Sequence, residues 1–216
     1  YEAFATLADQ HGFPHDFPSV EAATGSMRAL VTNPGFFGLV AEVGGKAVGS
    51  SFLDERSTIH AIGPVSVDPT AQDHHVGRAL MVGMLARARE TGTPGVRLVQ
   101  ISYHNRSLSL YSKLGFDVRG AYAAMHGVPL CLTLPGYRVR TATEADEDAC
   151  NALCLRVHGH TRAGEPLTGR AADAGALAQR RRTLALCGLA AAGRALTVTV
   201  TTAVEQACSA SESQIS

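Results

Sequence analysis

The order of hydrophobic and polar residues changes period several times along the chain, and each change marks a predicted element. Apolar residues recur at helical spacing up to Gly12, and Ser19 is suited to cap a second helix. Two strand-like runs follow, joined by Gly44 and Gly45, a pair typical of a hairpin turn. The pattern predicts helices over residues 1–12, 22–30, 76–90 and 107–114, and strands over residues 36–43, 47–53, 59–67, 96–101, 116–119 and 128–134.

Two features of this order indicate the fold class. Strands and helices alternate in the middle of the chain, which predicts an α/β layer with parallel strands there. Residues 59–67 form a long apolar run, as expected of a strand that is buried on both faces.

A second pattern begins after Pro135 and Gly136. Residues 137–140 form a short predicted strand, and Thr143 caps a helix that extends to about residue 158. Further on, residues 171–192 are predicted to be helical, residues 196–204 are β-prone and residues 209–216 form a polar tail. We therefore expect one domain over residues 1–135 and a second, incomplete segment over residues 136–216.

Composition narrows the class of protein. The chain has 216 residues, with 19 basic and 19 acidic side chains, and 45% of its residues are hydrophobic. It is too apolar for a disordered tail, and its zero net charge disfavours a dedicated nucleic-acid binder. No apolar run reaches the roughly 20 residues of a membrane span, and the first residues do not resemble a signal peptide. We expect a soluble, cytoplasmic protein with no nucleic-acid or membrane partner, and a homodimer stays open.

Residues 65–81 contain the most informative chemical pattern. A buried strand ends, a short loop follows and a helix begins with small residues in its first turn. Free backbone N–H groups at such a helix N-terminus suit a pyrophosphate, and Gly77 allows the ligand to approach the backbone. Many joints of this kind bind nothing, so the pattern alone does not identify a ligand.

The same residues resemble the acetyl-CoA-binding motif of the GNAT acetyltransferase superfamily. That motif is Arg or Gln, two residues, Gly, one residue, then Gly or Ala; Gln72 matches its first position and Gly77 its last. His75 stands where the first Gly is usual. Its side chain must point aside or narrow the phosphate cradle, and it can also hydrogen-bond a phosphate, so we expect weakened or altered binding rather than none.

A second stretch, residues 105–116, is similar to a later motif of the same family, in which Asn, Ser, Leu-Tyr and Leu-Gly-Phe recur. The resemblance covers residues 36–134 and, more loosely, the opening helices. It implies a GNAT-like mixed central sheet flanked by helices, with a partial second module at the C-terminus, and acetyl-CoA as co-substrate.

The resemblance also implies roles for individual residues. An amine attacks the thioester directly in a ternary complex, a backbone N–H near Val67 stabilises the oxyanion, and Tyr111 protonates the leaving thiolate. Asn105 is expected to fix the pantetheine arm or the strand end. The alternatives are a core aromatic role for Tyr111 and a helix-cap or turn role for Asn105. The expected cofactor-binding residues are Val65, Ser66, Val67, Gln72, His75, Val76, Gly77, Arg78 and Asn105.

The general base has no clear candidate in the sequence. Members of the family often place a carboxylate on the strand before the motif, but residues 59–67 contain none. Asp54, Glu55 and His60 are the nearby titratable groups, and a water chain would also serve. We expect no metal, since the adjacent His74 and His75 lack the spacing of zinc ligands on a helix.

The predicted function is acetyl transfer from acetyl-CoA to a small-molecule or peptide amine. The alternative is a non-catalytic acyl-CoA-binding or interaction module, and a generic nucleotide-phosphate binder is weaker. We expect the acceptor pocket around residues 13–17 and 36–37.

The organisation of the family leaves a further question about the ends of the chain. Residues 137–160 also resemble the opening of a GNAT domain, and the corresponding first strand is missing before residue 1. We expect a truncated tandem protein; alternatively, residues 137–160 replace the missing strand of the first module.

Overall fold

The structure is a computed structural model that describes residues 1–126, 143–161 and 197–207. Four predicted segments lie outside these residues: the strands over 128–134 and 137–140, the helix over 171–192 and the polar tail over 209–216. Within the described ranges, no helix is long and apolar enough to cross a membrane.

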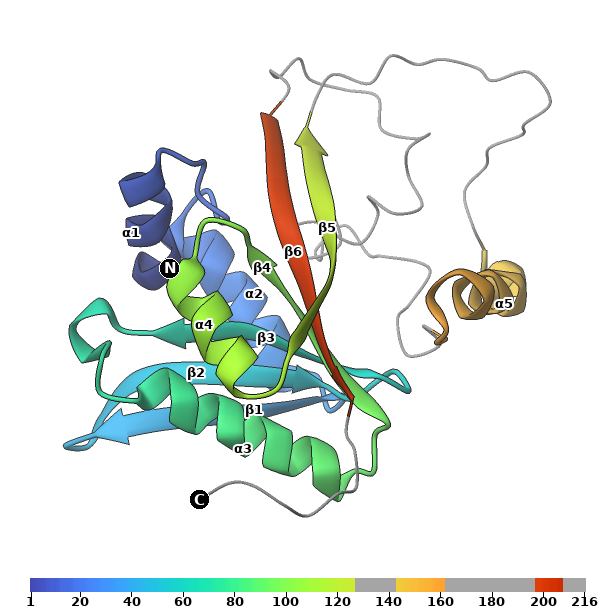
Figure 1. Cartoon of the computed structure of the whole chain (residues 1–216), viewed down its shortest axis with the longest axis horizontal. Coiled ribbons are helices and arrows are strands. Elements are labelled where there is room, and N and C mark those ends of the chain that lie inside the picture. The colour runs from blue at the N-terminus through green and yellow to red at the C-terminus, as the bar shows by residue number, and fades with distance from the viewer. Residues whose placement is uncertain (127–142, 162–196, 208–216) are drawn as a thin grey trace.

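Helices and strands follow one another much as the periodicity predicts (Figure 1). Short 3₁₀ turns precede α3 and α5, at Pro69–Ala71 and Glu144–Asp146. The described elements are α1 (Glu2–His11), α2 (Val20–Thr32), β1 (Phe36–Val43), β2 (Lys46–Asp54), β3 (His60–Val67), α3 (Val76–Glu90), β4 (Gly95–Ile101), α4 (Asn105–Lys113), β5 (Asp117–His126), α5 (Glu147–His158) and β6 (Thr197–Ala207).

Local sequence signals explain several element boundaries. The Ser19 hydroxyl accepts a hydrogen bond from the Ala22 N–H and so caps α2 as predicted. Gly44 and Gly45 have φ angles of 59° and 77°, which the hairpin turn between β1 and β2 requires and which glycine adopts without strain. Thr143 forms the predicted capping signal at the start of the η2–α5 segment, where its backbone N–H donates to the Asp146 carboxylate at 2.8 Å.

The sheet is mixed, as the α/β prediction requires, and its strand order is β1-β2-β3-β4-β6-β5. β3 and β4 are parallel, whereas β1–β2, β2–β3, β4–β6 and β6–β5 are antiparallel. The predicted strand over 196–204 therefore forms as β6, and it lies between β4 and β5 in the same sheet as the first half of the chain. The division of the chain at residue 135 stays a prediction.

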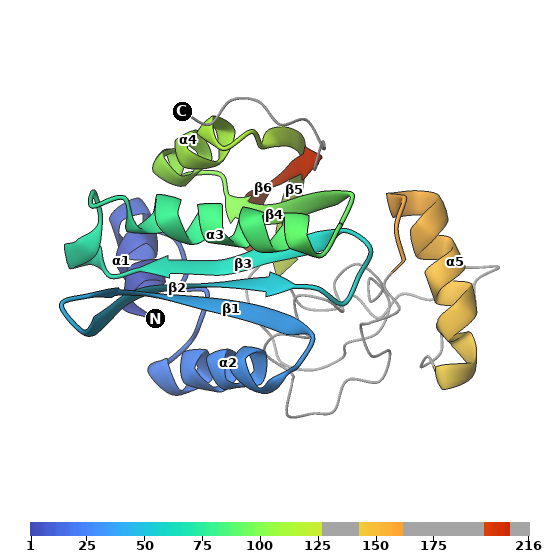
Figure 2. The same ribbon diagram turned by 90° about the horizontal axis from the view of Figure 1, so that it is seen from below.

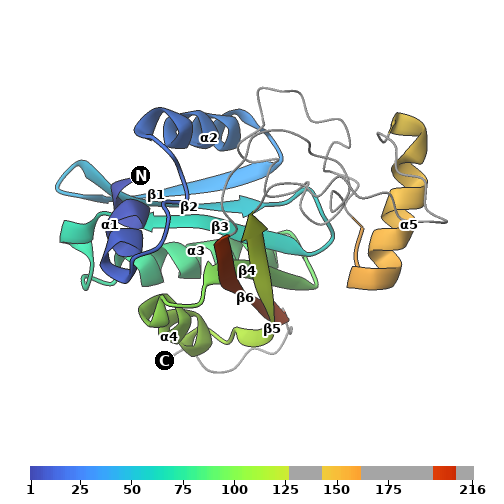
Figure 3. The ribbon, with the colours of Figure 1, turned by 90° about the horizontal axis from the view of Figure 1, so that it is seen from above.

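Helices cover both faces of the sheet. α3 and α2 lie on opposite sides of β1–β3 (Figures 2 and 3). The core lies under α3 and α4, and β3 is less buried than its apolar sequence predicts, because most of its residues are half-buried. The buried core residues are Leu53, Ile62, Met81, Met84, Leu85, Ala88, Val96, Leu98, Tyr111 and Phe116.

Candidate functional site

The parallel strands β3 and β4 separate along most of their length. Among the described residues, their ladder consists of two pairs, His60 with Val96 and Ala61 with Arg97. β4, β6 and β5 run at a steep angle to β1–β3 (Figure 1). The unpaired backbone edges of residues 62–67 in β3 and 98–101 in β4 therefore face an opening between the strands, which we call the fork.

Two backbone amides of β3 are directed into the fork. The Asp68 N–H donates to the Val48 carbonyl of β2 at 2.8 Å. Successive N–H groups of a strand point to opposite edges, so the Val67 and Val65 N–H groups point away from β2, toward the fork. Ser66 lies opposite Ser50 in the antiparallel ladder, which directs its amide toward β2. Of the three predicted binding residues on this strand, the structure thus brings the amides of two to the fork.

The N-terminus of α3 opens beside the end of β3. The helix begins at Val76, and no side chain of the described residues caps it. Its first N–H groups, of Val76, Gly77 and Arg78, precede the first intrahelical bond, which the Ala79 N–H makes to the His75 carbonyl at 2.9 Å. These unpaired donors at the positive end of the helix dipole can bind an anion.

His75 has the backbone conformation that glycine favours. Its φ and ψ angles are 60° and 8°, in the left-handed region, and its side chain is exposed. Asp73 has a φ angle of 70° as well. The substitution for the usual Gly therefore retains a left-handed backbone at this position, at a conformational cost, and the imidazole points out to solvent rather than capping the helix.

Glycines let the start of α3 lie close to its neighbours. A Cβ on Gly49 of β2 would lie 2.9 Å from the Ser66 carbonyl and 3.1 Å from Val76 Cγ1, so only glycine allows this approach. A Cβ on Gly77 would lie 3.7 Å from Val67 and from Leu110 of α4, an ordinary contact. Gly77 thus faces the point where β3, α3 and α4 meet. The sequence analysis missed Gly49, because its role depends on an element that is distant in sequence.

Gln72 and Asp73 are tied to α4 rather than left free. The Arg106 guanidinium donates to Gln72 Oε1 at 3.2 Å and forms an ion pair with Asp73. Arg106 therefore connects the loop before α3 with the helix that follows β4. Arg78 is exposed, and no ion pair is recorded for it within the described part of the chain.

Tyr111 lies in the core under α4. Its side chain is 8% exposed, and its ring lies 6.0 Å from that of Phe116. Burial raises the pKa of Tyr111, and a hydrogen bond with the Ser107 side chain works against that rise. The structure thus shows a core aromatic with a partnered hydroxyl, which leaves its predicted role in proton transfer as a proposal.

Asn105 is not the cap of α4. His104 occupies the N-cap position, and Asn105 is the first helical residue and is exposed. The alternative of a helix-cap role for Asn105 is therefore wrong. The predicted role in holding the pantetheine arm stays a prediction.

The suggested bases lie at the closed end of the fork. Asp54 and Arg56 form a bidentate ion pair, with donor–acceptor distances of 2.7 and 2.6 Å, and Glu55 accepts from Arg87 at 2.7 Å. His60 pairs with Val96 where β3 and β4 meet. At roughly 3.3 Å per residue, His60 is about 23 Å along β3 from Val67. None of the three side chains reaches the open end.

The two aromatic regions expected around the acceptor lie apart. Phe13 stacks on Tyr103, just beyond the end of β4, with ring centroids 4.4 Å apart. Phe36 instead lies under Arg56, with 4.5 Å between the guanidinium carbon and the ring centroid, and Phe37 lies under Arg87. Because Phe36 is opposite Asp54 in the hairpin register, the pair lies at the closed end and not beside the open fork.

Gln100 tests whether the fork fits a ligand. It lies on β4 in the unpaired half of the fork and is 7% exposed, yet neither Oε1 nor Nε2 has a hydrogen-bond partner in the described residues. A buried carboxamide without partners costs about 1–3 kcal/mol for each group. One donor and one acceptor suit a ligand amide, and the free amides of β3 and α3 suit a carbonyl and an anion. The residues present fit an extended ligand that has amides and an anionic end.

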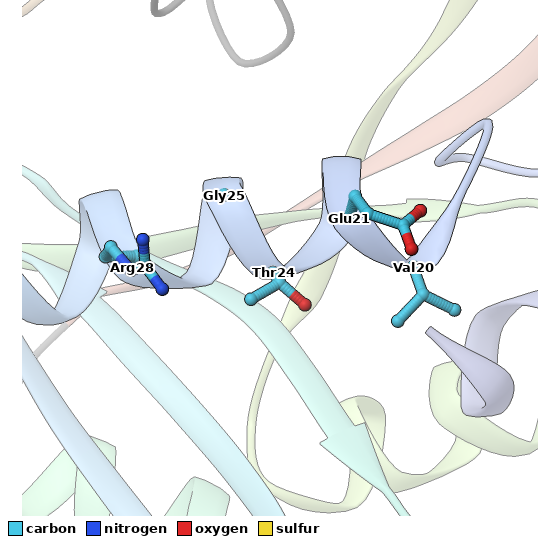
Figure 4. Close-up of a pocket in the computed structure, with 5 residues that line it drawn as sticks. All are labelled: Val20, Glu21, Thr24, Gly25 and Arg28. Atoms are coloured by element: carbon cyan, nitrogen blue, oxygen red, sulfur yellow. The ribbon is translucent and has the colours of Figure 1, made fainter.

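A separate hollow lies along α2 (Figure 4). Its volume is about 300 Å³, and all of its lining residues come from one helix. None of them belongs to the fork. They are Val20, Glu21, Thr24, Gly25 and Arg28. In residues 1–126, 143–161 and 197–207, no group of three or more His, Cys, Asp or Glu could hold a metal ion.

A family model described as the acetyltransferase (GNAT) family matches residues 2–116. The chain belongs to the GNAT acetyltransferase family. The match confirms the family predicted from the two motifs, and the mixed sheet with its flanking helices confirms the predicted fold class.

Known proteins of this family show partial similarity to the chain. The mycothiol acetyltransferase of Nocardia farcinica is 36% identical over 74 residues, which are 33% of this chain and 24% of that protein. The ribosomal-protein-S18-alanine N-acetyltransferase from Escherichia coli is 12% identical, with a TM-score of 0.47, over 88% of this chain and 81% of that one. The PaiA N-acetyltransferase from Thermoplasma acidophilum, solved with coenzyme A, is 18% identical, with a TM-score of 0.41, over 46% of this chain and 62% of that one.

Proposed function

We propose that the protein is an acetyltransferase that moves an acetyl group from acetyl-CoA to a primary amine by direct attack in a ternary complex. The fork supports this proposal most directly, because β3 has two backbone amides directed into it next to the uncapped N-terminus of α3. The acceptor is a small-molecule or peptide amine.

Acetyl-CoA supplies the acetyl group as an activated thioester. The amides of Val76, Gly77 and Arg78 hold its pyrophosphate, and the Gln100 carboxamide hydrogen-bonds an amide of the pantetheine arm. With these groups as anchors, the arm lies along the unpaired edges of the fork, where the backbone amides of β3 take the place of a strand partner.

Two groups of the chain assist the chemical step. The Val67 N–H is fixed by the β2–β3 ladder and donates to the carbonyl oxygen as negative charge develops on it. The Tyr111 hydroxyl donates a proton to the leaving sulfur. Its pKa, raised by burial, keeps it protonated at neutral pH. The amine loses its proton to water, since Asp54, Glu55 and His60 lie at the closed end.

The acceptor approaches at the open end, past the stacked rings of Phe13 and Tyr103. His11 lies on the other side of the Tyr103 ring, with 4.8 Å between centroids. Burial raises the pKa of the Asp16 carboxyl and, together with the Asp16 charge, that of Tyr103. Aromatic faces beside a carboxylate suit the cationic end of an amine.

Turnover with a panel of primary amines tests the proposal. Free CoA and acetylated amine are quantified by mass spectrometry, with Tyr111→Phe as a variant that keeps the ring. Acetylated product that forms in step with CoA supports acetyl transfer. If acetyl-CoA raises the melting temperature but no amine releases CoA, the chain is instead a non-catalytic acyl-CoA-binding module. The lack of a carboxylate near the fork, among the described residues, favours this second function.

A further inference from the structure

Three polar side chains lie on one face of α4. His104 caps the helix, Ser107 follows three residues later and Tyr111 four residues after that, so the three side chains lie one above another. His104 Nδ1 lies 2.8 Å from the Ser107 hydroxyl oxygen. Ser107 in turn hydrogen-bonds Tyr111. The three groups form a continuous hydrogen-bonded chain from the end of β4 to the buried phenol.

The hydrogen bonds in this chain can all run in one direction. The Ser107 bond lowers the pKa of Tyr111, which is the effect of a hydroxyl that donates to the phenol oxygen. Ser107 has one proton, so its oxygen is then free to accept from Nδ1–H of His104. Burial lowers the pKa of His104, and the nearby charges of Arg106 and His11 lower it further, so the ring is neutral at neutral pH. A neutral ring with the proton on Nδ1 completes the direction.

The far nitrogen of His104 connects the chain to solvent. His104 is half-buried, and no hydrogen bond of its Nε2 is recorded within the described residues. Tyr111, at the other end, is 8% exposed. A buried phenol that gives up a proton in every turnover needs a path by which it is protonated again, and the hydrogen-bonded side chains provide one.

We propose that His104 and Ser107 form a proton relay that returns a proton from solvent to the Tyr111 hydroxyl during each acetyl transfer. The inference rests on the proposed function of Tyr111 as the donor to the leaving sulfur. Ser107 and His104 are relay residues, because they act through Tyr111 and not on the substrate.

The relay balances the proton count of the reaction. As the carbon–sulfur bond breaks, its electron pair stays on sulfur, and sulfur takes the Tyr111 proton. The phenolate oxygen takes the Ser107 proton, Ser107 takes the proton from His104 Nδ1, and Nε2 takes one from water. The amine releases one proton to water, so none is gained or lost overall. His104 then returns to the Nδ1–H form by exchange with water.

The first test uses the protein without any ligand. NMR titration of the Tyr111 ring carbon bonded to oxygen gives the pKa of the phenol in wild type and in Ser107→Ala, Ser107→Thr and Ser109→Ala. The relay predicts a higher pKa in Ser107→Ala and wild-type values in the other two, because Thr keeps the hydroxyl. Ser109 is exposed on the same helix and serves as the matched control. An unchanged Tyr111 pKa in Ser107→Ala overturns the relay.

The second test measures kcat, KM for acetyl-CoA and the rescue of kcat by imidazole. Tyr111→Phe is expected to lower kcat by about 100-fold, and Ser107→Ala and His104→Ala by at least about tenfold, within the range of general acid catalysis. KM for acetyl-CoA stays within about twofold of wild type, since no binding contact is lost. Added imidazole restores kcat of His104→Ala but not of Ser107→Ala, and Ser109→Ala behaves as wild type.

The outcomes separate the relay from the proposed function. If Tyr111→Phe loses kcat but His104→Ala and Ser107→Ala keep it, the relay is wrong and water protonates the phenol. If KM for acetyl-CoA rises while kcat is unchanged, the two residues bind the ligand and relay no proton. If Tyr111→Phe keeps full kcat, the relay and the role of Tyr111 both fall, while acetyl transfer stands. Wild-type protein that turns over no amine contradicts the proposed function itself, and the relay with it.

Discussion

Replacement of His75 by glycine should test the backbone geometry at the start of α3. His75 has φ 60° and ψ 8°, and a left-handed conformation costs a residue with a Cβ about 1–2 kcal/mol. Glycine removes that cost but adds about 0.4–1 kcal/mol of unfolded-chain entropy. We therefore expect His75→Gly to change the free energy of unfolding by between about 0 and +1.6 kcal/mol.

The neighbouring His74 supplies the control. It is exposed, and among the described residues the non-glycine positions with positive φ are Asp73 and His75. His74→Gly therefore pays the entropy without relief of strain, and it should lower the free energy of unfolding by about 0.4–1 kcal/mol. The difference between the two variants isolates the strain at residue 75, about 1–2 kcal/mol.

Urea denaturation followed by circular dichroism measures both variants, since the chain has no Trp for fluorescence. Acetyl-CoA affinity, measured on the same proteins, should rise in His75→Gly, because the loss of the imidazole opens the first-turn amides to the pyrophosphate. If His75→Gly destabilises the protein as much as His74→Gly does, residue 75 is not left-handed and the reasoning about the anion site is refuted.

Three further changes probe the site and its stability. Gln100→Leu should raise the free energy of unfolding of the unliganded protein by about 1–3 kcal/mol, because it removes buried unpaired groups, and should weaken acetyl-CoA binding; lower stability on urea denaturation would contradict the first effect. Gly49→Ala should lower stability by about 1–3 kcal/mol, since its Cβ would lie 2.9 Å from the Ser66 carbonyl; a melting temperature equal to wild type would show that the start of α3 is free to shift. Burial lowers the pKa of both His60 and His104 from the model value of 6.5, so their stabilising effect is complete above pH 6.5 and is lost as the pH falls through their folded-state pKa values; urea midpoints that do not change between pH 8 and pH 5 would argue against buried neutral rings.

Local signals in the sequence predict much of the fold. The period of the apolar residues gives α3 its observed bounds, 76–90. The glycine pair at 44–45 predicts the hairpin, and Ser19 and Thr143 predict helix starts, because each signal acts within a few residues of itself. The motif around residues 72–77 places the anion site at the helix N-terminus for the same reason.

Features that depend on distant residues are not visible in the sequence. The strand at 197–207 shows its β-propensity, but nothing local indicates that it pairs between β4 and β5. Phe36 was expected near the acceptor, yet the hairpin register pairs it with Asp54 at the closed end. The partnerless side chain of Gln100 depends on the separation of β3 and β4, a tertiary property that no spacing of residues indicates.

The proposed binding of acetyl-CoA along the fork is the central claim, and residue-resolved amide hydrogen exchange tests it most directly. The amides of Val65 and Val67 and of Val76, Gly77 and Arg78 lack backbone partners in the geometry described above, and acetyl-CoA should provide them. The account predicts that saturating acetyl-CoA slows exchange at these five amides, while the amide of Ser66, directed toward β2, changes little. Exchange that stays fast at all five, with protection elsewhere or nowhere, would contradict the account.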